Sequence, residues 1–458
     1  MLSCYQSEQD STAIPITPLT GDQLSSWMEN ADQRAQRWVC ASAFKASSSS
    51  TCLIPNEKGD LELVLTGAGN TPLWSIAGLS TSLPEGCYRL DCDWGTADKN
   101  QAAVGWGLGA YRFSRYSKGH SAPARLLLDD TLDCALIERQ VTAAYLGRDL
   151  INTPAADMMP QHLAESVQQL ATQHGANVEV TAGQALLEQN YPAIHAVGRA
   201  SVHPPALIDL RWGDTTHPRV TLVGKGVCFD SGGLDLKPSK GMRLMKKDMG
   251  GAAQVLGIAA MVMDAKLPVS LRVLIPAVEN AVSGDAYRPG DVLATRAGLN
   301  VEVDNTDAEG RIILCDALAE ACTENPEVLI DFATLTGAAR VAVGTELPAM
   351  FCNDETMAAE IRSASVEHVD QVWRLPLHAD YKDMLDSRIA DLVNSPSSPY
   401  GGAITAALFL EAFVSAEVSW AHFDVMAWNL RNRPGRPEGG ELMGARAVYH
   451  YLQQRYGN

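Results

Sequence analysis

The stretch VTLVGKGVCFDSGGLDLKPSKGMRLMKKDMGGAAQVLGIAAMVMDA, residues 220–265, contains a strand-like run, a polar loop and a helix-like run in succession. The first part is apolar and rich in β-branched residues, which is typical of a buried strand. The last part, after Asp248, is apolar over the length of a helix and has two glycines, Gly250 and Gly251, near its start. A strand, a loop and a helix in this order form the repeating unit of an α/β domain.

The same order recurs along the second half of the chain. The strand-like run LNVEVDN (299–305) precedes the helix-like run RIILCDALAEACTEN (311–325), and further strand-like runs occupy residues 205–213, 269–277, 326–337 and 419–428. Strands that alternate with helices predict a large α/β domain whose central mixed sheet is flanked by helices. In such sheets, ligand sites lie beyond the carboxyl ends of the strands.

The first part of the chain predicts a separate, smaller α/β domain. Residues 1–127 alternate between helix-like and strand-like runs, and residues 128–153 form one long helix-like run that ends near Asn152, before Pro154. We therefore expect a smaller N-terminal domain (1–127), a connecting helix (128–153) and a larger C-terminal domain (154–458).

Composition argues against several classes of protein. The net charge of −18 over 458 residues disfavours a nucleic-acid partner, because binding phosphates requires a positive face. The N-terminus has no secretory signal, and no apolar run reaches the roughly 18 residues of a transmembrane helix. The ten cysteines are scattered without a C-x-x-C pair, so we expect reduced core cysteines and a cytoplasmic location.

Four acids follow the strand-like runs or precede the helices: Asp230, Asp248, Asp307 and Glu309. Held together in a closed site, four carboxylates would repel one another strongly, and some would be forced to protonate. Two divalent cations would cancel this charge, and carboxylate oxygens suit magnesium, manganese or zinc. None of the ten histidines lies in these segments, so a histidine-type zinc site is not indicated.

Several residues in these segments also have a purely structural interpretation. Asp248 precedes an apolar run and could be a helix N-cap, while Asp304 and Asn305 have the composition of a turn. Lys246 and Lys247 have the appearance of surface charge. The DSGG run at 230–233 is shared with the nucleophile loop of chymotrypsin-like serine proteases, but the chain does not have the pattern of an all-β protein.

Two segments carry a resemblance to a known family. GKGVCFDSGGLDLKPSKGMRLMKKDMGGAA (224–253) and NTDAEGR (305–311) closely resemble the two signature segments of the leucyl (cytosol) aminopeptidase family. Support comes from GRDLINTPAADMMP (147–160), DFATLTGAARVAVG (331–344), GGAITAALFLEAFV (401–414) and WAHFDVMAW (420–428). Near the end of the chain, ELMGARAVYHYL (441–452) departs from the family's common pattern, which affects the expected shape of the substrate pocket.

The resemblance implies a centre with two divalent metal ions per subunit, zinc, manganese or magnesium. Asp230 and Glu309 would bridge both ions, and Asp307 would complete the more labile site. Lys225 and Asp248 would complete the tighter site, so the amine of Lys225 would have to lose its proton when metal binds. Lys237 would polarise the scissile carbonyl, and Arg311 would hold a bicarbonate ion as the proton relay.

The resemblance further implies a metal-dependent aminopeptidase that removes an N-terminal residue, leucine or another apolar residue, by means of a metal-bridging water. The free amine of the peptide would meet the tighter metal and Asp248. The residues expected to bind the substrate are Met245, Asn305, Thr334, Leu335, Gly337 and Ala427. A homohexamer, built as a dimer of trimers and active in peptide turnover, is implied as well. A DNA-binding architectural hexamer is the alternative, and the negative charge of the chain disfavours it.

Overall fold

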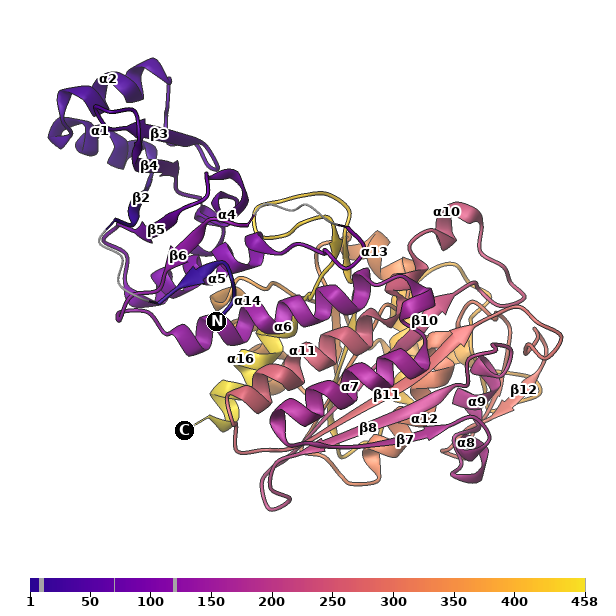
Figure 1. Ribbon diagram of the computed structural model, residues 1–458. Helices are drawn as coiled ribbons and strands as arrows, with labels where there is room; N and C mark the ends of the chain where they lie inside the picture. Colours follow the sequence, from indigo (N-terminus) through magenta and orange to yellow (C-terminus); the bar gives the residue numbers. More distant parts are fainter. Residues whose placement is uncertain (8–11, 70, 118–121, 458) are drawn as a thin grey trace. The chain divides into compact units, whose positions relative to one another are not determined.

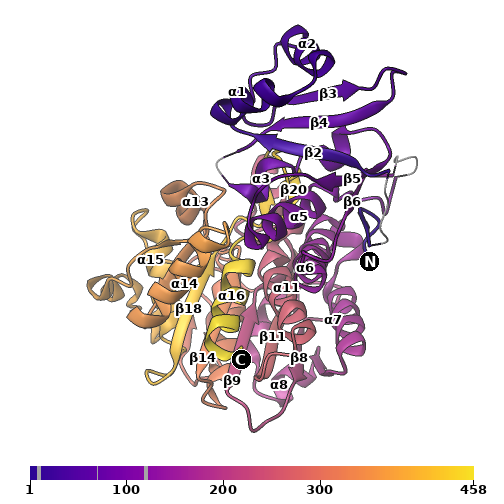
Figure 2. The ribbon, with the colours of Figure 1, turned by 90° about the vertical axis from the view of Figure 1, so that its left-hand side faces the viewer.

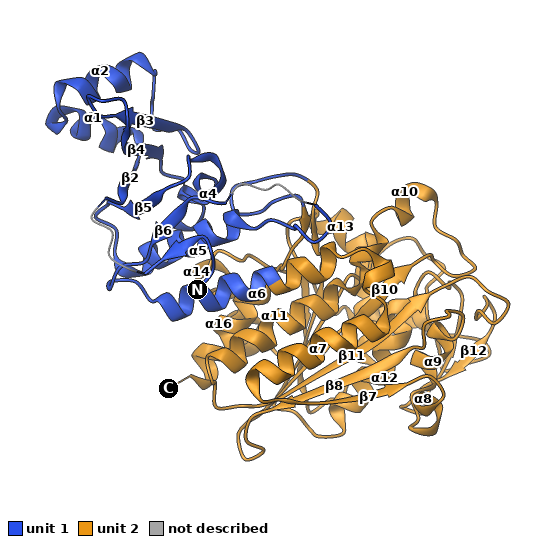
Figure 3. Cartoon of the chain, in the orientation of Figure 1, with its two compact units in different colours: residues 1–145, 431–438 blue, residues 146–430, 439–458 orange. Residues whose placement is uncertain are grey.

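The computed structural model describes residues 1–7, 12–69, 71–117 and 122–457. The chain forms two compact units, one of residues 1–145 and 431–438, the other of residues 146–430 and 439–458 (Figure 3). The units divide inside one helix, α6 (Cys134–Asn152), and the first unit includes the return segment 431–438. The expected domain boundaries at residues 127 and 153 stay a prediction.

The first unit is built on a six-stranded sheet in the order β1-β6-β5-β2-β4-β3. Strand β3 pairs antiparallel with β4, and the other neighbours are parallel. Its strands are β1 (Tyr5–Gln6), β2 (Ile14–Leu19), β3 (Thr51–Pro55), β4 (Leu61–Gly67), β5 (Cys87–Leu90) and β6 (Arg125–Leu127). Its helices are α1 (Gly21–Asn30), α2 (Gln33–Ala41), α3 (Pro72–Ser75), α4 (Leu79–Ser82) and α5 (Thr96–Ala110).

The second unit is built on a nine-stranded mixed sheet in the order β16-β15-β18-β14-β9-β11-β8-β7, with β10 as a further partner of β11. Strands β18, β14, β9, β11 and β10 run parallel to their neighbours in this series, whereas β15, β8 and β7 are antiparallel additions. The strands of this sheet are β7 (Asn177–Ala182), β8 (Ala206–Trp212), β9 (Arg219–Gly224), β10 (Gly226–Asp230), β11 (Ser270–Asn280), β14 (Val328–Ala333), β15 (Ala349–Cys352), β16 (Trp373–Arg374) and β18 (Ser419–Asp424).

Helices cover both faces of this sheet, because consecutive right-handed crossovers in opposite directions place their helices on opposite faces. Helices α7, α11 and α16 lie together in front of the sheet in Figures 1 and 2. The helices of the second unit, besides the end of α6, are α7 (Pro160–His174), α8 (Ala185–Glu188), α9 (Pro192–Gly198), α10 (Ser239–Met242), α11 (Gly250–Asp264), α12 (Glu309–Cys322), α13 (Gly337–Val343), α14 (Glu355–Glu367), α15 (Gly402–Glu411) and α16 (Ala445–Tyr456). Short 3₁₀ segments are η1 (Ala155–Asp157), η2 (Met245–Met249) and η3 (Ala379–Leu385).

Smaller sheets complete the unit. Strands β12 (Val292–Ala294), β13 (Asn300–Glu302) and β17 (Leu392–Val393) form one of them, and β19 (Trp428–Asn429) pairs with β20 (Gly439–Gly440) in the other. The run LNVEVDN is thus a strand, as expected, but it pairs outside the central sheet. The two-unit α/β architecture with a central mixed sheet is confirmed.

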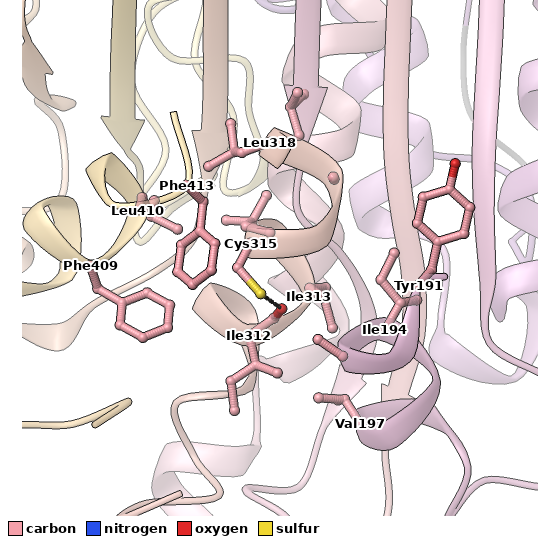
Figure 4. Close-up of a cluster of buried hydrophobic side chains, with 14 of the residues drawn as sticks. Tyr191, Ile194, Val197, Ile312, Ile313, Cys315, Leu318, Phe409, Leu410 and Phe413 are labelled. Atoms are coloured by element: carbon pink, nitrogen blue, oxygen red, sulfur yellow. Dashed lines mark hydrogen bonds between the residues drawn. The ribbon is translucent and has the colours of Figure 1, made fainter. Parts of the chain in front are cut away.

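The core of the second unit explains why its central strands lack an alternating pattern. All six residues of β14 are buried, because helices cover both faces of the sheet. Residues of α9, α12 and α15, among them Ile194, Ile313 and Phe409, pack into one cluster (Figure 4). Each such side chain contributes roughly 1.5–3 kcal/mol when it leaves water, so this cluster fixes α12 and its first turn firmly against the sheet.

The cysteines only partly match the expectation that they are reduced and buried in the core. All ten are free, and seven are buried, including Cys315, whose thiol donates to the carbonyl of Ile312 at 2.9 Å (Figure 4). Cys40 is exposed, and Cys92 and Cys134 are half-buried. The core interpretation is therefore wrong for these three: Cys40 is in α2, Cys92 lies between β5 and α5, and Cys134 is the first residue of α6.

Candidate metal centre

The carboxyl ends of the parallel strands supply the first group of polar side chains. Asp230 is the last residue of β10, Asn280 the last of β11 and Asp424 the last of β18. Lys225 directly follows β9 and Thr334 directly follows β14. Because parallel strands end at the same edge of a sheet, these residues gather where an α/β sheet usually binds its ligand.

Asp307 and Glu309 come from the segment between β13 and α12. With Asp230 they form a group in which one carboxylate oxygen from each residue lies within 4.8 Å of the others. Glu309 is the first residue of α12, where the positive end of the helix dipole favours a negative charge. In the described part of the chain this is the one such group of acidic, histidine or cysteine side chains that could hold a metal ion.

Lys225 lies between the acids of the predicted tighter site. Its Nζ is 2.7 Å from Oδ2 of Asp248 and 2.8 Å from Oε1 of Glu309, and all three side chains are almost completely buried. The position requires a glycine at 310, because a Cβ there would lie 2.4 Å from Cε of Lys225. The five residues carried over as metal ligands therefore meet in one place, with Lys225 among the carboxylates.

Lys237 occupies the other side of the group. Its Nζ is 2.7 Å from Oδ2 of Asp230 and also pairs with Oδ1 of Asp307. Oδ1 of Asp230 accepts hydrogen bonds from the backbone N–H of Gly232 at 2.8 Å and from Nδ2 of Asn280 at 2.9 Å. Asp230 is thus held in place by an ion pair on one oxygen and by two hydrogen bonds on the other.

The pKa values show a site that carries too much negative charge for its surroundings. Burial and the charge of Asp230 raise the pKa of Glu309 to about 8, although Lys225 opposes the shift. Burial and Asp230 also raise the pKa of Asp307 to about 6, against the effect of Lys237. Burial alone would lower the pKa of Lys225, but its acidic neighbours outweigh burial and raise it. If all four acids were ionised, four carboxylates would face two ammonium groups and two negative charges would be left over, which is why the pKa of Glu309 is raised.

Two buried oxygens indicate that further cations fit the site. Oε2 of Glu309 and Oδ1 of Asn280 are shielded from solvent and have no hydrogen-bond partner among the described residues. A buried acceptor without a partner is costly, and the site also has an excess of negative charge. Carboxylate oxygens with a deprotonated amine are suitable ligands for a divalent ion such as zinc or manganese, so the residues present fit the implied metals.

Arg311 lies two residues beyond Glu309 in α12. Its Nη1 donates to the carbonyl of Asn394 at 2.6 Å, and its buried Nε has no partner among the described residues. Burial lowers the pKa of Arg311 to about 10, yet the side chain stays charged at neutral pH. A buried guanidinium with a free N–H group fits a small anion such as bicarbonate.

The segment Thr334–Gly337 lies beside the metal ligands. Oγ1 of Thr334 donates to Oδ1 of Asp248 at 2.7 Å. The N–H groups of Leu335 and Thr336 donate to Oδ1 of Asp424 at 2.9 and 3.2 Å, so the end of β18 fixes the conformation of this loop.

The remaining residues predicted to bind substrate have different surroundings. Met245 is half-buried at the start of η2, next to the ligand segment. Oδ1 of Asn305 accepts from the N–H of Asp307 at 2.8 Å, so this residue shapes the ligand turn. Ala427 is fully buried, and its Cβ lies 2.4 Å from where a Cβ of residue 250 would be, so it packs against Gly250. Their roles toward a substrate stay predictions.

Two structural interpretations of the sequence are wrong. Asp248 is not the N-cap of α11, which begins at Gly250 without a side-chain cap, because its carboxylate is engaged by Lys225 and Thr334. Lys247 is not a surface lysine. It is 2% exposed, and burial lowers the pKa of its amine to about 7.

The serine nucleophile is also excluded by its contacts. Oγ of Ser231 donates to the carbonyl of Asn280 at 2.7 Å and accepts from the N–H of Gly233 at 3.2 Å. A serine nucleophile needs a general base as its hydrogen-bond partner, and neither contact supplies one.

Three residues of the site were missed by the sequence reasoning: Asn280, Asp424 and Asn394. The first two are polar residues at the carboxyl ends of strand-like runs, so the rule that singled out the acids would have found them. Asn394 had no such signal. Its Oδ1 accepts from the N–H groups of Asp304 and Asn305, which lie about ninety positions earlier in the chain.

Comparison with known families gives two matches. Residues 145–449 match the model of the cytosol aminopeptidase family, catalytic domain, and residues 14–129 match that of the M17 aminopeptidase, N-terminal domain. Among curated proteins, a probable cytosol aminopeptidase of Geotalea uraniireducens is 36% identical over 422 residues, covering 85% of each chain. One from Rhodococcus opacus is 40% identical over 349 residues, covering 72% of this chain and 68% of the relative.

Solved structures agree with these matches. The crystal structure of a cytosol aminopeptidase from Coxiella burnetii has a TM-score of 0.97 and 50% identity, covering 99% of this chain and 100% of the other. The bottromycin maturation enzyme BotP in complex with Mn has a TM-score of 0.86 and 32% identity, covering 98% and 100% of the two chains.

Proposed function

This chain belongs to the cytosol aminopeptidase family, which makes it a metal-dependent aminopeptidase, and we propose that it removes the N-terminal residue of peptides at a two-metal centre in its second unit. The ligands in this proposal are Lys225, Asp230, Asp248, Asp307 and Glu309. Zinc and manganese are the metals we favour, with magnesium as a further candidate. The Mn complex of BotP supports manganese by analogy.

One observation carries this proposal. Three carboxylate groups from two segments of the chain offer oxygens within 4.8 Å of one another, and the buried Oε2 of Glu309 has no partner among the described residues. A folded protein does not normally gather buried acids without a cation, because each unpaired charge costs several kcal/mol.

Bound divalent ions would supply Lewis acidity and lower the pKa of a water held between them. The side chains of the protein would hold the ions and stabilise the reacting groups. Asp230, Asp307 and Glu309 would hold the ions together with Lys225 and Asp248, and the resemblance gives Asp230 and Glu309 a role toward both ions. Lys237, which lies against Asp230 and Asp307, would direct its charged amine at the scissile carbonyl oxygen and stabilise the oxyanion.

Arg311 would hold the bicarbonate that relays protons. Support comes from the buried Nε, which has no partner among the described residues, and from the nearby turn of Asn305 to Glu309 that carries two of the metal ligands. A carbonate-like anion would accept hydrogen bonds from the guanidinium and could exchange a proton with the reacting groups.

Restriction to N-terminal residues would follow from the amine of the substrate. A free α-amine can approach Asp248, which is fixed by Thr334, whereas the amide of an internal residue carries no charge to attract. The loop of Thr334–Gly337, held by Asp424, would align the peptide backbone. The resemblance favours leucine or another apolar N-terminal residue.

The wider setting is proposed on the resemblance alone: a homohexamer that acts in peptide turnover in the cytoplasm. Along the described ranges of the chain, no helix combines the length and the apolar character needed to cross a membrane. No feature of the described surface favours the DNA-binding alternative over peptide hydrolysis, and the net charge of −18 disfavours it.

Removal of metal tests the proposed function directly. Exhaustive dialysis against a chelator is expected to lower the cleavage of aminoacyl-p-nitroanilides by about a hundredfold or more, and Mn²⁺ or Zn²⁺ should restore it. The Ser231→Ala variant should keep the chelator sensitivity and most of its activity. Full activity in the chelated protein, or loss of activity in Ser231→Ala alone, would contradict the two-metal proposal.

Metal binding should also release protons. In the metal-free protein Lys225 holds its proton, and Glu309, with its pKa of about 8, is largely protonated at pH 7. Neither group can ligate a cation in that form, so at least about one proton per subunit should leave and the affinity should rise between roughly pH 6 and 9. Calorimetric titration with Mn²⁺ in two buffers of different ionisation enthalpy measures the number of protons released per subunit. An affinity for Mn²⁺ that does not change with pH would refute the predicted proton release.

A further inference from the structure

Asn394 is a buried asparagine whose side chain binds the turn that leads to Asp307 and Glu309. It directly follows β17, and its exposed fraction is 0%. Its Oδ1 accepts hydrogen bonds from the backbone N–H groups of Asp304 at 2.8 Å and of Asn305 at 3.2 Å. Its Nδ2 donates to the carbonyl of Asn305 at 2.7 Å. The amide therefore holds the start of this turn through both its acceptor and its donor.

The backbone of Asn394 contacts the residues on either side of the turn. Its N–H donates to the carbonyl of Glu302, the last residue of β13, at 2.9 Å. Its carbonyl accepts from Nη1 of Arg311 at 2.6 Å, and Arg311 is in the first turn of α12, two residues beyond Glu309. One residue thus joins the strand before the turn, the turn itself and the arginine after it.

The turn passes this constraint on to a proposed metal ligand. Oδ1 of Asn305 accepts from the N–H of Asp307 at 2.8 Å, so the residue that the amide holds also shapes the backbone at Asp307. Removing the amide would leave two N–H groups and a carbonyl without their partner, and the turn would have to shift to satisfy them. The next residue, Thr306, is held separately, because its N–H donates to Oδ2 of Asp235 at 2.8 Å. Loss of Asn394 should therefore displace the turn without unfolding it.

We propose that Asn394 is a positioning residue of the two-metal centre. Its side chain fixes the turn that presents Asp307 and Glu309, and its carbonyl fixes the guanidinium of Arg311 relative to them. This assignment rests on the proposed aminopeptidase function, and in it Asn394 acts through these three residues and not on the substrate. A residue that orients metal ligands is typically worth roughly 10- to 100-fold in metal affinity or activity. A shift of about 1 Å in the reacting groups can cost about 100-fold in rate.

The test compares Asn394→Ala with Asn353→Ala in the full-length protein. Asn353 makes the same kind of contacts elsewhere, because its Oδ1 accepts from the N–H of Trp420 at 2.8 Å and its Nδ2 donates to the carbonyl of Val418 at 3.0 Å. At saturating Mn²⁺, kcat for the best aminoacyl-p-nitroanilide should fall by about 10- to 100-fold in Asn394→Ala. It should stay within about twofold in Asn353→Ala. KM should change by less than about threefold in both, because the substrate contacts are kept.

Metal binding gives a second measurement that does not depend on turnover. In a calorimetric titration with Mn²⁺ alone, at least one of the two sites should bind about tenfold or more weakly in Asn394→Ala, and neither should change in Asn353→Ala. The thermal midpoint of the metal-free protein should fall in both variants, since each loses hydrogen bonds between two segments. A purely structural asparagine would lower this midpoint and leave kcat at saturating Mn²⁺ unchanged.

Asn394→Asp is a milder second variant that decides the question even if Asn394→Ala does not fold. It keeps the shape of the side chain and an acceptor for the two N–H groups, and it loses the donor to the carbonyl of Asn305. Its kcat at saturating Mn²⁺ should be about tenfold below that of the wild type.

A double variant tests the link to Arg311. Asn394→Ala combined with Arg311→Met should lose less kcat than the product of the two single losses, because both changes disturb the same guanidinium. A loss equal to the product would overturn the part of the assignment that concerns Arg311, and an unchanged affinity for Mn²⁺ in Asn394→Ala would overturn the part that concerns the ligand turn.

Two outcomes would overturn the whole assignment. One is a kcat within about twofold of the wild type in both Asn394 variants at saturating Mn²⁺, and the other is an equal loss in Asn394→Ala and Asn353→Ala. A wild-type protein without Mn²⁺-dependent cleavage of any aminoacyl-p-nitroanilide would instead refute the proposed function itself. An active wild type with unimpaired Asn394 variants rejects the positioning role alone.

Discussion

Replacing Glu309 by glutamine is expected to lower kcat/KM for the best aminoacyl-p-nitroanilide by at least about 10³-fold. Glutamine keeps the shape of the side chain but loses the charge that a bridging ligand needs, so both metal sites would be weakened at once. Asp307→Asn should have a similarly large effect through the more labile site. Steady-state kinetics at saturating Mn²⁺ measures both losses.

The matched control is Asp304→Asn, an identical chemical change three residues before Asp307. Asp304 is exposed, and its backbone N–H, not its carboxylate, donates the hydrogen bond to Oδ1 of Asn394. This variant should keep kcat/KM within about twofold, as surface substitutions usually do. Equal losses in Asp304→Asn and Asp307→Asn would mean that the whole turn, and not a ligand, is being disturbed.

Thermal unfolding separates loss of metal from loss of fold. Metal-free Glu309→Gln should unfold cooperatively near the temperature of the metal-free wild type, because a pKa raised to about 8 shows that the charged carboxylate is not favoured in the empty site. Mn²⁺ should raise the midpoint of the wild type and raise that of the variant much less, since a ligand stabilises only the state that binds it. Normal stabilisation together with normal activity would remove Glu309 from the centre.

The sequence predicted the strand and helix order well where one periodic pattern covers a whole element. All residues of β14 and nearly all residues of α11 are buried, so their apolar runs left little ambiguity. β13 was recognised as a strand, but a three-residue strand carries no information about its partners, and it pairs outside the central sheet.

Prediction of the site was limited in the same way, because a local pattern does not reveal long-range contacts. Its acids could be found because each follows or precedes a strong element, and the resemblance assigned their roles. Lys247 was misjudged, because a lysine next to another lysine and an acid has the composition of a surface segment. Lys247 lies in η2, which packs against β10, and no local sequence pattern indicates such a contact. Asn394 was missed for the same physical reason, since a long-range contact leaves no signature in nearby residues.

Lys237 offers the second large effect, and it separates catalysis from metal binding. Lys237→Met is expected to lower kcat by about 10²- to 10³-fold, the usual loss when one group that stabilises an oxyanion is removed. KM should change much less, because the amine would act on charge that develops in the transition state.

The metal affinity of Lys237→Met should stay the same or rise. In the metal-free protein the amine pairs with Asp230 and Asp307, so it competes with a cation for both carboxylates. Removing the amine leaves the carboxylates of Asp230 and Asp307 without this ion-pair partner. The more negative site then binds a divalent ion more tightly. Lys240→Met, at an exposed lysine of α10, is the control and should change neither quantity. A Lys237→Met protein that lost activity only because it lost Mn²⁺ would make Lys237 a structural ion-pair partner. Normal metal binding with a slow kcat is the result that only a group acting on the substrate can produce.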